Sequence, residues 1–487
     1  MEHGSRGSPA LTILTALVSR LQASGRATVS IPAQRGDRAP ERASGPSPAN
    51  AVRAEVLRAL WDGVLLAPRV LGYAASRRRL AAEVRADLDR PAHVDPVPTV
   101  TIPRDRPLAI FVACAEVSGE IHAVNFVRAM QRRIADAGAP PPRLCGLGGD
   151  RLASAGVELL GRPVDRAQMG FQGIASSLPY YTGLLRDAAA HVREVRPDVV
   201  CAVDSPALHV PLLRIAHRYD VRTLHFVTPQ YWGWAPWRVN SYKKGVDRAL
   251  SILPFERAWF ERRGVSVAHV GHPLLDELAH VPQTTPREDA RELVILPGSR
   301  SRVIERNLPW MLAAAERLRA RVGDVPVVVA HERSEIAEEI RAHIERAGAA
   351  SWARLETGDL HAILARARAA LSVSGTVLLD LLHHDLPTVV LYRLAHAREV
   401  WLKDRLLTVP WFSSINLLAA SEVYPEFAFH GDGPVERIGE TLLRCYNDRA
   451  WRERCRAGLA LARERLGPAG ACDRAAAHAL ALACGAT

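Results

Sequence analysis

The sequence predicts an α/β protein of two doubly wound, Rossmann-like domains that face a cleft, with a helical N-terminal extension before them. From residue 108 onward, short apolar runs alternate with helix-length amphipathic patterns, as in parallel sheets covered by helices on both faces. The alternation starts again at residue 293, after a segment containing three prolines. A length of 487 residues is enough for at least two such domains.

Four segments follow from this pattern. The expected boundaries are 1–106 for the extension, 107–272 for the first Rossmann-like domain, 290–450 for the second, and 451–487 for a C-terminal helical segment. Within the extension, residues 33–50 are rich in Pro, Gly, Ser and charge, which is typical of a linker.

Residues 51–90 of the extension have helical periodicity, with basic residues grouped at Arg77, Arg78 and Arg79. Two interpretations stay open for them. A helix pair that packs on the protein and leaves a solvated basic face is favoured. Helices that lie on an anionic membrane are the alternative.

The first domain contains the strand-like runs LAIFVAC, DVVCAVD, RTLHFVT and ALSILP, and the second contains LVIL, PVVVA, ALSVS and PTVVLY. Residues 269–289 between the two series suit a hinge. In open α/β sheets, ligands bind outside the carboxyl ends of the strands. The loops that follow these runs therefore carry the candidate functional residues.

The net charge and the cysteine content limit which binding partners and which cellular compartment we expect. The formal net charge of +11 and the pI of about 9.7 favour anionic partners. No helix-turn-helix or zinc-finger spacing is present, so nucleic acid is the weaker option. Seven cysteines without a CxxC pattern fit a reducing, cytoplasmic compartment. No uncharged apolar run reaches the length of a transmembrane helix. The apolar residues 10–18 have only a weakly basic flank and are followed at once by Arg20, so a signal peptide is not expected.

Two turns of the second domain place small residues between a strand and a helix. The first has Gly298 and Ser299 followed by Arg300, and the second is the run Ser374-Gly375-Thr376. A helix start offers free N–H groups and partial positive charge to a phosphate, and a guanidinium binds such oxyanions bidentately. Either turn alone is also explained by ordinary helix capping, but the two together favour a diphosphate site.

The first domain offers acid–base candidates at its own strand ends. Asp204 ends an apolar strand, where its carboxylate is suited to accept a proton from an attacking hydroxyl, or equally to cap the next helix. The turn CAEVSGEIHAV supplies Glu116 and His122 as further catalytic candidates, and Ser118 and Gly119 as acceptor-side candidates.

Aromatic residues of the first domain are candidates for a lipid-facing or acceptor wall. Trp232 and Trp234 lie in the loop TPQYWGWAPWR. The uncharged stretch 169–185 contains Met169, Phe171, Tyr180 and Tyr181; a lipid-facing patch and a plain buried helix explain it equally well.

The sequence contains neither GxxxxGK[ST] nor HExxH. Its only DxD is Asp87-Leu88-Asp89 in the N-terminal helices, where a solvated helix face is the simpler explanation. We therefore expect a mechanism without metal and without cofactor, in which helix ends and Arg300 carry the phosphate charge.

Ten motifs in order resemble the lipid-A-disaccharide synthase family of inverting GT-B glycosyltransferases, over roughly residues 107–470. They are SGEIHAVNFVRAM, GLGGDRLASAG, MGF, RPDVVCAVDSPA, HFVTPQYWGWAPWRV, DRALSILPFE, VGHPL, LPGSRSRVI, VSGTVLLDLL and INLLAASEVYPE. Each motif alone is weakly specific, whereas the ordered set is specific.

The resemblance implies transfer of 2,3-diacylglucosamine from its UDP donor to 2,3-diacylglucosamine 1-phosphate at the cytoplasmic face of the inner membrane, by a peripheral enzyme. A homodimer is left open. Asp204 matches the family's catalytic aspartate, and the turns with Arg300 and Thr376 match contacts to the nucleotide diphosphate. Asp380 matches a position near the ribose. Asn416 and Glu422 match a segment that lines the cleft.

The chain also departs from the family pattern. Glu120 replaces an aspartate, Asp380 replaces a glutamate, and Ser421 replaces an arginine. Moving a carboxylate by one methylene can lower activity or alter the substrate. Two alternatives therefore remain: a non-catalytic or altered-substrate relative that binds UDP-sugars, and a UDP-sugar 2-epimerase on the same fold.

Overall fold

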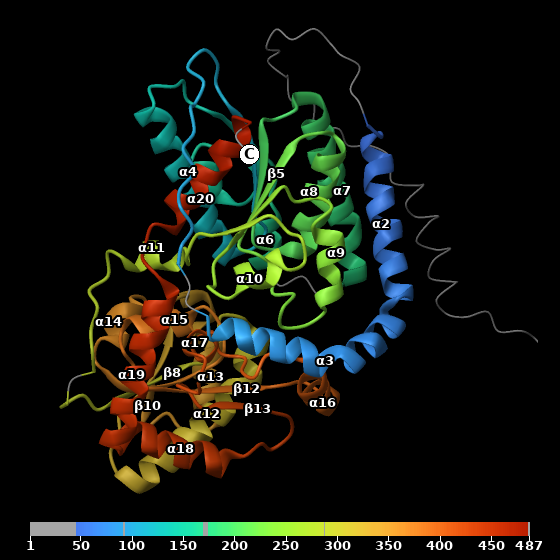
Figure 1. The fold of residues 1–487 in the computed structure, drawn as a ribbon. Coiled ribbons are helices and arrows are strands. Elements are labelled where there is room, and N and C mark those ends of the chain that lie inside the picture. The colour runs from blue at the N-terminus through green and yellow to red at the C-terminus, as the bar shows by residue number, and fades with distance from the viewer. Residues whose placement is uncertain (1–44, 91–92, 169–173, 287, 486–487) are drawn as a thin grey trace, which may run out of the picture. The chain divides into compact units, whose positions relative to one another are not determined.

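The computed structural model describes residues 45–90, 93–168, 174–286 and 288–485. Most of the first expected linker, together with Met169 and Phe171, lies outside the described residues. Each of the two predicted doubly wound domains is present as a parallel sheet with covering helices (Figure 1). We call them the first and second lobe.

The first lobe is built on seven parallel strands in the order β3-β2-β1-β4-β5-β6-β7. The strands are β1 (Ala109–Ala113), β2 (Arg143–Leu147), β3 (Glu158–Gly161), β4 (Val199–Val203), β5 (Arg222–Phe226), β6 (Arg248–Ser251) and β7 (Val267–His269). The helices between them include α4 (Val117–Asp136), α5 (Asp150–Ser154), α6 (Pro163–Gln168), α7 (Ile174–Val195), α8 (Pro206–Arg218), α9 (Val239–Tyr242) and α10 (Glu256–Glu261).

The second lobe is built on six parallel strands in the order β10-β9-β8-β11-β12-β13. They are β8 (Glu292–Leu296), β9 (Val327–His331), β10 (Ala353–Thr357), β11 (Ala367–Ser372), β12 (Thr388–Arg393) and β13 (Glu426–Phe429). Its helices include α12 (Ser301–Val322), α13 (Ala337–Arg346), α14 (Leu360–Leu364), α15 (Val377–His383), α16 (Ala397–Leu406), α17 (Ser414–Ala419) and α18 (Val435–Asn447). The short helix α11 (Leu274–Leu278) lies between the two series of strands.

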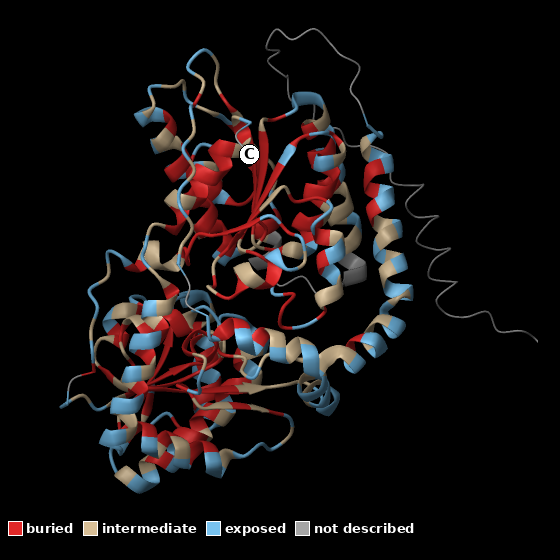
Figure 2. Ribbon diagram, viewed as in Figure 1, coloured by how far each residue is buried: buried red, intermediate tan, exposed pale blue. Residues whose placement is uncertain are grey.

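The strand order positions the functional loops. In each sheet the direction of winding reverses beside the first strand of the lobe, between β1 and β4 and between β8 and β11. The strands on both sides of these points are buried, as Figure 2 shows in red. A reversal of this kind leaves a crevice at the carboxyl ends of the two strands, where ligands bind.

Helices from both ends of the chain complete the lobes. The helices predicted in the extension are present as α2 (Pro48–Val64) and α3 (Leu66–Leu88). Helix α2 packs against α7 and α8, and α3 contacts α10 of the first lobe as well as α16 and α17 of the second. At the other end, α19 (Arg449–Leu466) packs on α17, whereas α20 (Ala471–Ala483) returns to α4 of the first lobe (Figure 1).

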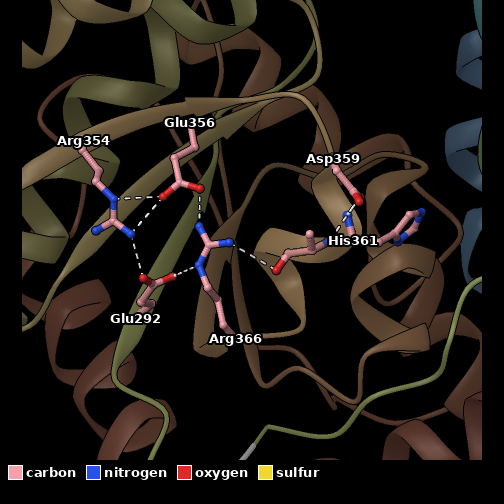
Figure 3. Close-up of polar contacts among 7 residues, drawn as sticks. Glu292, Arg354, Glu356, Asp359, His361 and Arg366 are labelled. Atoms are coloured by element: carbon pink, nitrogen blue, oxygen red, sulfur yellow. Dashed lines mark hydrogen bonds and ion pairs between the residues drawn. The ribbon is translucent and has the colours of Figure 1, made fainter.

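An ion-pair network joins β8, β10 and Arg366, the residue before β11. Arg354 and Arg366 each contact both Glu292 and Glu356, and the Nε of Arg366 lies 2.8 Å from Glu292 (Figure 3). Nearby, the carboxylate of Asp359 accepts hydrogen bonds from the first backbone N–H groups of α14. These contacts stabilise the sheet on the side of β10.

Candidate active site

The turn after β8 has the geometry that its small residues predict. Gly298 has φ +106°, and a Cβ atom there would lie 2.7 Å from Val303 Cγ1, so only glycine fits without strain. Arg300 follows at the N-cap position of α12, in extended conformation. The turn therefore brings a guanidinium to the start of a 22-residue helix.

The second predicted turn lies beside the first, because β11 pairs with β8. The hydroxyl of Ser374 points away from the open side of the turn, because it donates a hydrogen bond to the carbonyl oxygen of Phe412 at 3.0 Å. Gly375 and Thr376 are exposed, and a Cβ at Gly375 would meet nothing within 4 Å. Open backbone is thus available at this turn.

The first lobe presents Asp204 at the carboxyl end of β4, beside the start of α4. The Cβ of Asp204 would lie 3.5 Å from a Cβ added at Gly119. The start of α4 therefore lies in van der Waals range of the Asp204 side chain.

Asp204 and Ser205 both have left-handed backbones, with φ angles of 57° and 45°. Two buried histidines fix this conformation, because both lie within hydrogen-bonding distance of the Asp204 carbonyl oxygen. The distances are 2.6 Å from His209 Nδ1 and 2.9 Å from His225 Nε2. Burial lowers the pKa of His209 to about 3 and also lowers the pKa of His225, so both rings are neutral near pH 7. A left-handed residue persists only where its surroundings hold it in this way.

An ion pair joins the two sets of turns. Arg300 Nη2 lies 3.4 Å from a carboxylate oxygen of Glu116, the N-cap residue of α4. Burial and the neighbouring charge of Asp204 raise the pKa of Glu116, and Arg300 opposes this shift. Glu116, Asp204 and Arg300 therefore form one electrostatic group drawn from both lobes.

His122 and Asp380 both lie near Glu277, and Asp380 also lies near Glu332. His122 Nδ1 lies 3.0 Å from a carboxylate oxygen of Glu277 on α11. Burial, together with the charges of Glu332 and Glu277, raises the pKa of Asp380 to about 7. The carboxyl group of Asp380 is therefore half protonated near neutral pH, and its protonated form can donate a hydrogen bond.

Two predicted residues lie inside the lobes. Asn416 is fully buried, and its side chain bonds the Tyr424 carbonyl and the Glu426 carboxylate while accepting from two backbone N–H groups. Trp232 is 4% exposed, and its indole N–H donates to Glu256 at 2.9 Å. Both side chains shape the loops around the candidate site from within.

Other predicted residues are more accessible. Trp234 is 51% exposed, and Ser118 and Glu422 are also exposed. Tyr180 and Tyr181 are half-buried on α7 and make an edge-to-face ring contact.

The sequence interpretation missed His209, His225 and Glu277. Of the three, only His209 could be suspected from the sequence, because it follows Asp204 closely in the same segment, CAVDSPALHV. The other two reach the site from a neighbouring strand and from α11, which no local spacing reveals. Within the described ranges, no group of three or more His, Cys, Asp or Glu residues is arranged to hold a metal ion.

Comparison with known proteins agrees with this architecture. The lipid-A-disaccharide synthetase family model matches residues 110–453. The chain belongs to the lipid-A-disaccharide synthase family. A lipid-A-disaccharide synthase of Myxococcus xanthus is 35% identical over 383 residues, which are 77% of this chain and 98% of that protein. The Geobacter sulfurreducens lipid-A-disaccharide synthase is 31% identical over 75% of this chain and 95% of that protein.

The S. aureus MnaA–UDP co-structure is similar in fold, with a TM-score of 0.51 at 12% identity over 75% of this chain and 94% of that one. This member of the lipid-A-disaccharide synthase family is a glycosyltransferase with the GT-B fold, as the resemblance implied. The family implies a UDP-sugar donor and a phosphorylated sugar acceptor. Helices α2, α3 and α20 lie outside the matched residues.

Proposed function

We propose that this family member transfers 2,3-diacylglucosamine from UDP-2,3-diacylglucosamine to 2,3-diacylglucosamine 1-phosphate. The products are a β-1,6-linked disaccharide and UDP. The observation that carries the proposal is the ion pair between Arg300 and Glu116, because it brings an anion-binding helix start within reach of the carboxylates around Asp204.

In this mechanism, Arg300 and the exposed backbone of Gly375 and Thr376 bind the diphosphate of the donor. The start of α12 adds its N–H groups and the positive end of its dipole. These groups stabilise the negative charge that grows on UDP as the bond from the sugar C1 to the diphosphate oxygen breaks.

Asp204 acts as the general base. The 6-hydroxyl oxygen of the acceptor attacks C1 from the face opposite UDP, which inverts the anomeric configuration. The hydroxyl proton passes to the Asp204 carboxylate, and UDP leaves with the electron pair of the broken bond. Glu116 competes with the diphosphate for Arg300 and is displaced from it when the donor binds.

The remaining residues bind the two sugars. Asp380 lies at the second-lobe side with a pKa of about 7, which suits a hydrogen bond to a ribose hydroxyl in either protonation state. His122 and Ser118 lie on the acceptor side. Because both substrates carry acyl chains, we place the reaction at the cytoplasmic face of the inner membrane. No helix among the described residues is both long and apolar enough to cross a bilayer.

The direct test is incubation of the purified protein with both acylated sugars, followed by mass spectrometry of the products. We expect disaccharide and UDP in equal amounts.

Asp204→Asn should lower kcat by about a hundredfold or more with unchanged UDP affinity, because the amide cannot accept the proton. An Asp204→Asn variant with full activity contradicts the general-base assignment.

A parallel test concerns the diphosphate. Arg300→Ala should weaken UDP binding by about tenfold or more, because the charged bidentate contact is lost. Arg317→Ala, at the other end of α12 and paired with Glu436, is the matched control and should bind UDP normally.

Conversion of the UDP-sugar without an acceptor would favour an epimerase, and UDP binding without any turnover would favour a non-catalytic relative.

A further inference from the structure

Large apolar side chains are exposed along one side of the N-terminal helices. Leu57, Trp61, Val64 and Leu71 are between 60% and 73% exposed. The spacing of four and three residues places Leu57, Trp61 and Val64 on one side of α2, and Leu71 is exposed on α3 beyond the break at Leu65. The opposite side of α2 packs on the first lobe through Ala51, Val52 and Glu55. The helices are therefore apolar on both sides, although only one side is covered.

The other side of α3 packs toward the candidate active site. Helix α3 contacts α16, where the Nε of Arg77 donates to the carbonyl of Leu407 at 2.9 Å. The ring of Tyr73 on α3 contacts the ring of Trp237, with centroids 5.4 Å apart. Thr408 in turn donates to the carbonyl of Gly233 at 3.0 Å. Figure 1 shows α3 running beside α16. Tyr73 and Thr408 are buried, so these contacts join the inner side of α3 to α16 and the loop 231–238. We call the exposed residues Leu57, Trp61, Val64 and Leu71 the apolar strip.

Exposed tryptophans lie on α16 and on the loop 231–238, the two segments that α3 contacts. Trp401 on α16 is 54% exposed and Trp234 is 51% exposed. An arginine lies over each ring, Arg405 at 5.0 Å and Arg238 at 4.6 Å. Tryptophan paired with a cation is typical of the boundary between lipid and water. Trp234 follows β5, the strand next to β4 and Asp204.

Every acidic side chain of α2 and α3 pairs with an arginine, including the partly exposed Asp62, which lies 2.7 Å from Arg69, and Glu83, which lies 3.0 Å from Arg263. The acidic residues Glu55 and Asp87 are buried and bind Arg218 and Arg262 of the first lobe. Arg53 and Arg78 are exposed at the two ends of the apolar residues. The uncovered side therefore combines apolar and positively charged groups. Such a surface is suited to contact with an anionic lipid bilayer.

We propose that the apolar strip docks the enzyme on an anionic lipid bilayer, with the loop 231–238 at the point where acylated sugars enter. This inference rests on the proposed function for its substrates, but the surface itself is formed largely by α2 and α3, which the family match does not include. Docking would hold the first lobe, through α2, at a fixed position on the bilayer.

The test is flotation of the full chain with vesicles of phosphatidylcholine alone or mixed with phosphatidylglycerol. We expect binding only to the anionic vesicles. The triple variant Leu57→Ser, Trp61→Ser and Leu71→Ser should bind at least about tenfold more weakly, because three side chains no longer leave water. Leu461→Ser, a 36% exposed leucine on α19, is the matched control and should bind like the wild type. Vesicle binding that survives the triple substitution overturns the proposal.

A second variant tests the charges. Arg53→Gln with Arg78→Gln should bind anionic vesicles more weakly and flatten the salt dependence of binding. If the partner were a second copy of the chain, the triple variant would instead dissociate a dimer in sedimentation while vesicle binding stayed unchanged, which also overturns the proposal.

Activity separates this proposal from the proposed function. With substrates dispersed in detergent, the triple variant should keep wild-type turnover, and with vesicle-embedded substrates its rate should fall about tenfold. Wild-type protein that binds vesicles but forms no disaccharide in either format contradicts the function alone. Equal loss of activity in both formats contradicts the docking role.

Discussion

At the scale of single residues, the conformation of Asp204 is the most demanding feature of the site. Two consecutive left-handed residues cost about 1–2 kcal/mol each, and the bonds from His209 and His225 to one carbonyl oxygen offset that cost. If Asp204 is the base, the two histidines are positioning residues, since they act on its backbone and not on substrate.

His225→Phe should lower kcat by about tenfold to a hundredfold while leaving the UDP dissociation constant unchanged, because a small displacement of the base affects the chemical step. His225→Gln offers an N–H at the place of Nε2 and should restore most of the rate. The readouts are kcat, KM and UDP binding for both variants. A phenylalanine variant with wild-type kcat, or one in which glutamine and phenylalanine lose kcat equally, contradicts the positioning role.

The same scale shows what sequence can and cannot predict. Small residues and Arg300 between a strand and a helix fix a turn, so the conformation of the turn at the candidate anion site followed from local pattern. Trp232 and Trp234 have the same local context, yet one packs on Phe255 and the other is exposed. Asn416 has partners at Tyr424 and Glu426, which the chain brings together only on folding. Side-chain direction in a loop depends on tertiary contacts, and the sequence contains no local signal for it.

At the scale of elements, the ion-pair network of β8, β10 and the start of β11 makes the second lobe sensitive to acid. Burial alone would raise the pKa of Glu356, but hydrogen bonds from Arg366 and Arg354 outweigh it and lower the pKa below its ordinary value of 4.5. A carboxylate with a lowered folded-state pKa stabilises the fold fully above the ordinary value. That stability is lost as the pH falls through the folded-state pKa.

Glu356→Gln should therefore lower Tm at pH 7, and this effect should disappear as the pH falls through the lowered folded-state pKa of Glu356. The measurement is the difference in Tm between wild type and variant across this range. Glu338→Gln, in an exposed pair with Arg341, is the control and should shift Tm little. A Glu356→Gln difference that does not change with pH would show that the network contributes packing and not charge.

At the scale of the whole molecule, the order of elements along the chain differs from their arrangement in space. The alternation of strands and helices predicts both sheets, because each strand needs only its own apolar run. It does not predict that α20, the last helix, returns to the first lobe. Arg133 on α4 binds Asp473 on α20 through two hydrogen bonds, of 2.9 and 2.6 Å. No feature of residues 471–483 alone identifies this partner.

The return of α20 leads to a prediction about which lobe a C-terminal mutation destabilises. Leu480 is fully buried with Val127 and Met130 in the core of the first lobe. Leu480→Ala leaves a cavity there and should cost about 2–4 kcal/mol of unfolding free energy. Hydrogen exchange should then accelerate in β1 and β4 and stay nearly unchanged in β8 and β11, although residue 480 follows the second lobe in sequence. Leu461→Ala, on the partly exposed side of α19, should cost less than about 1 kcal/mol. Faster exchange confined to the second lobe would contradict the packing of α20, because a cavity loosens first the core that contains it.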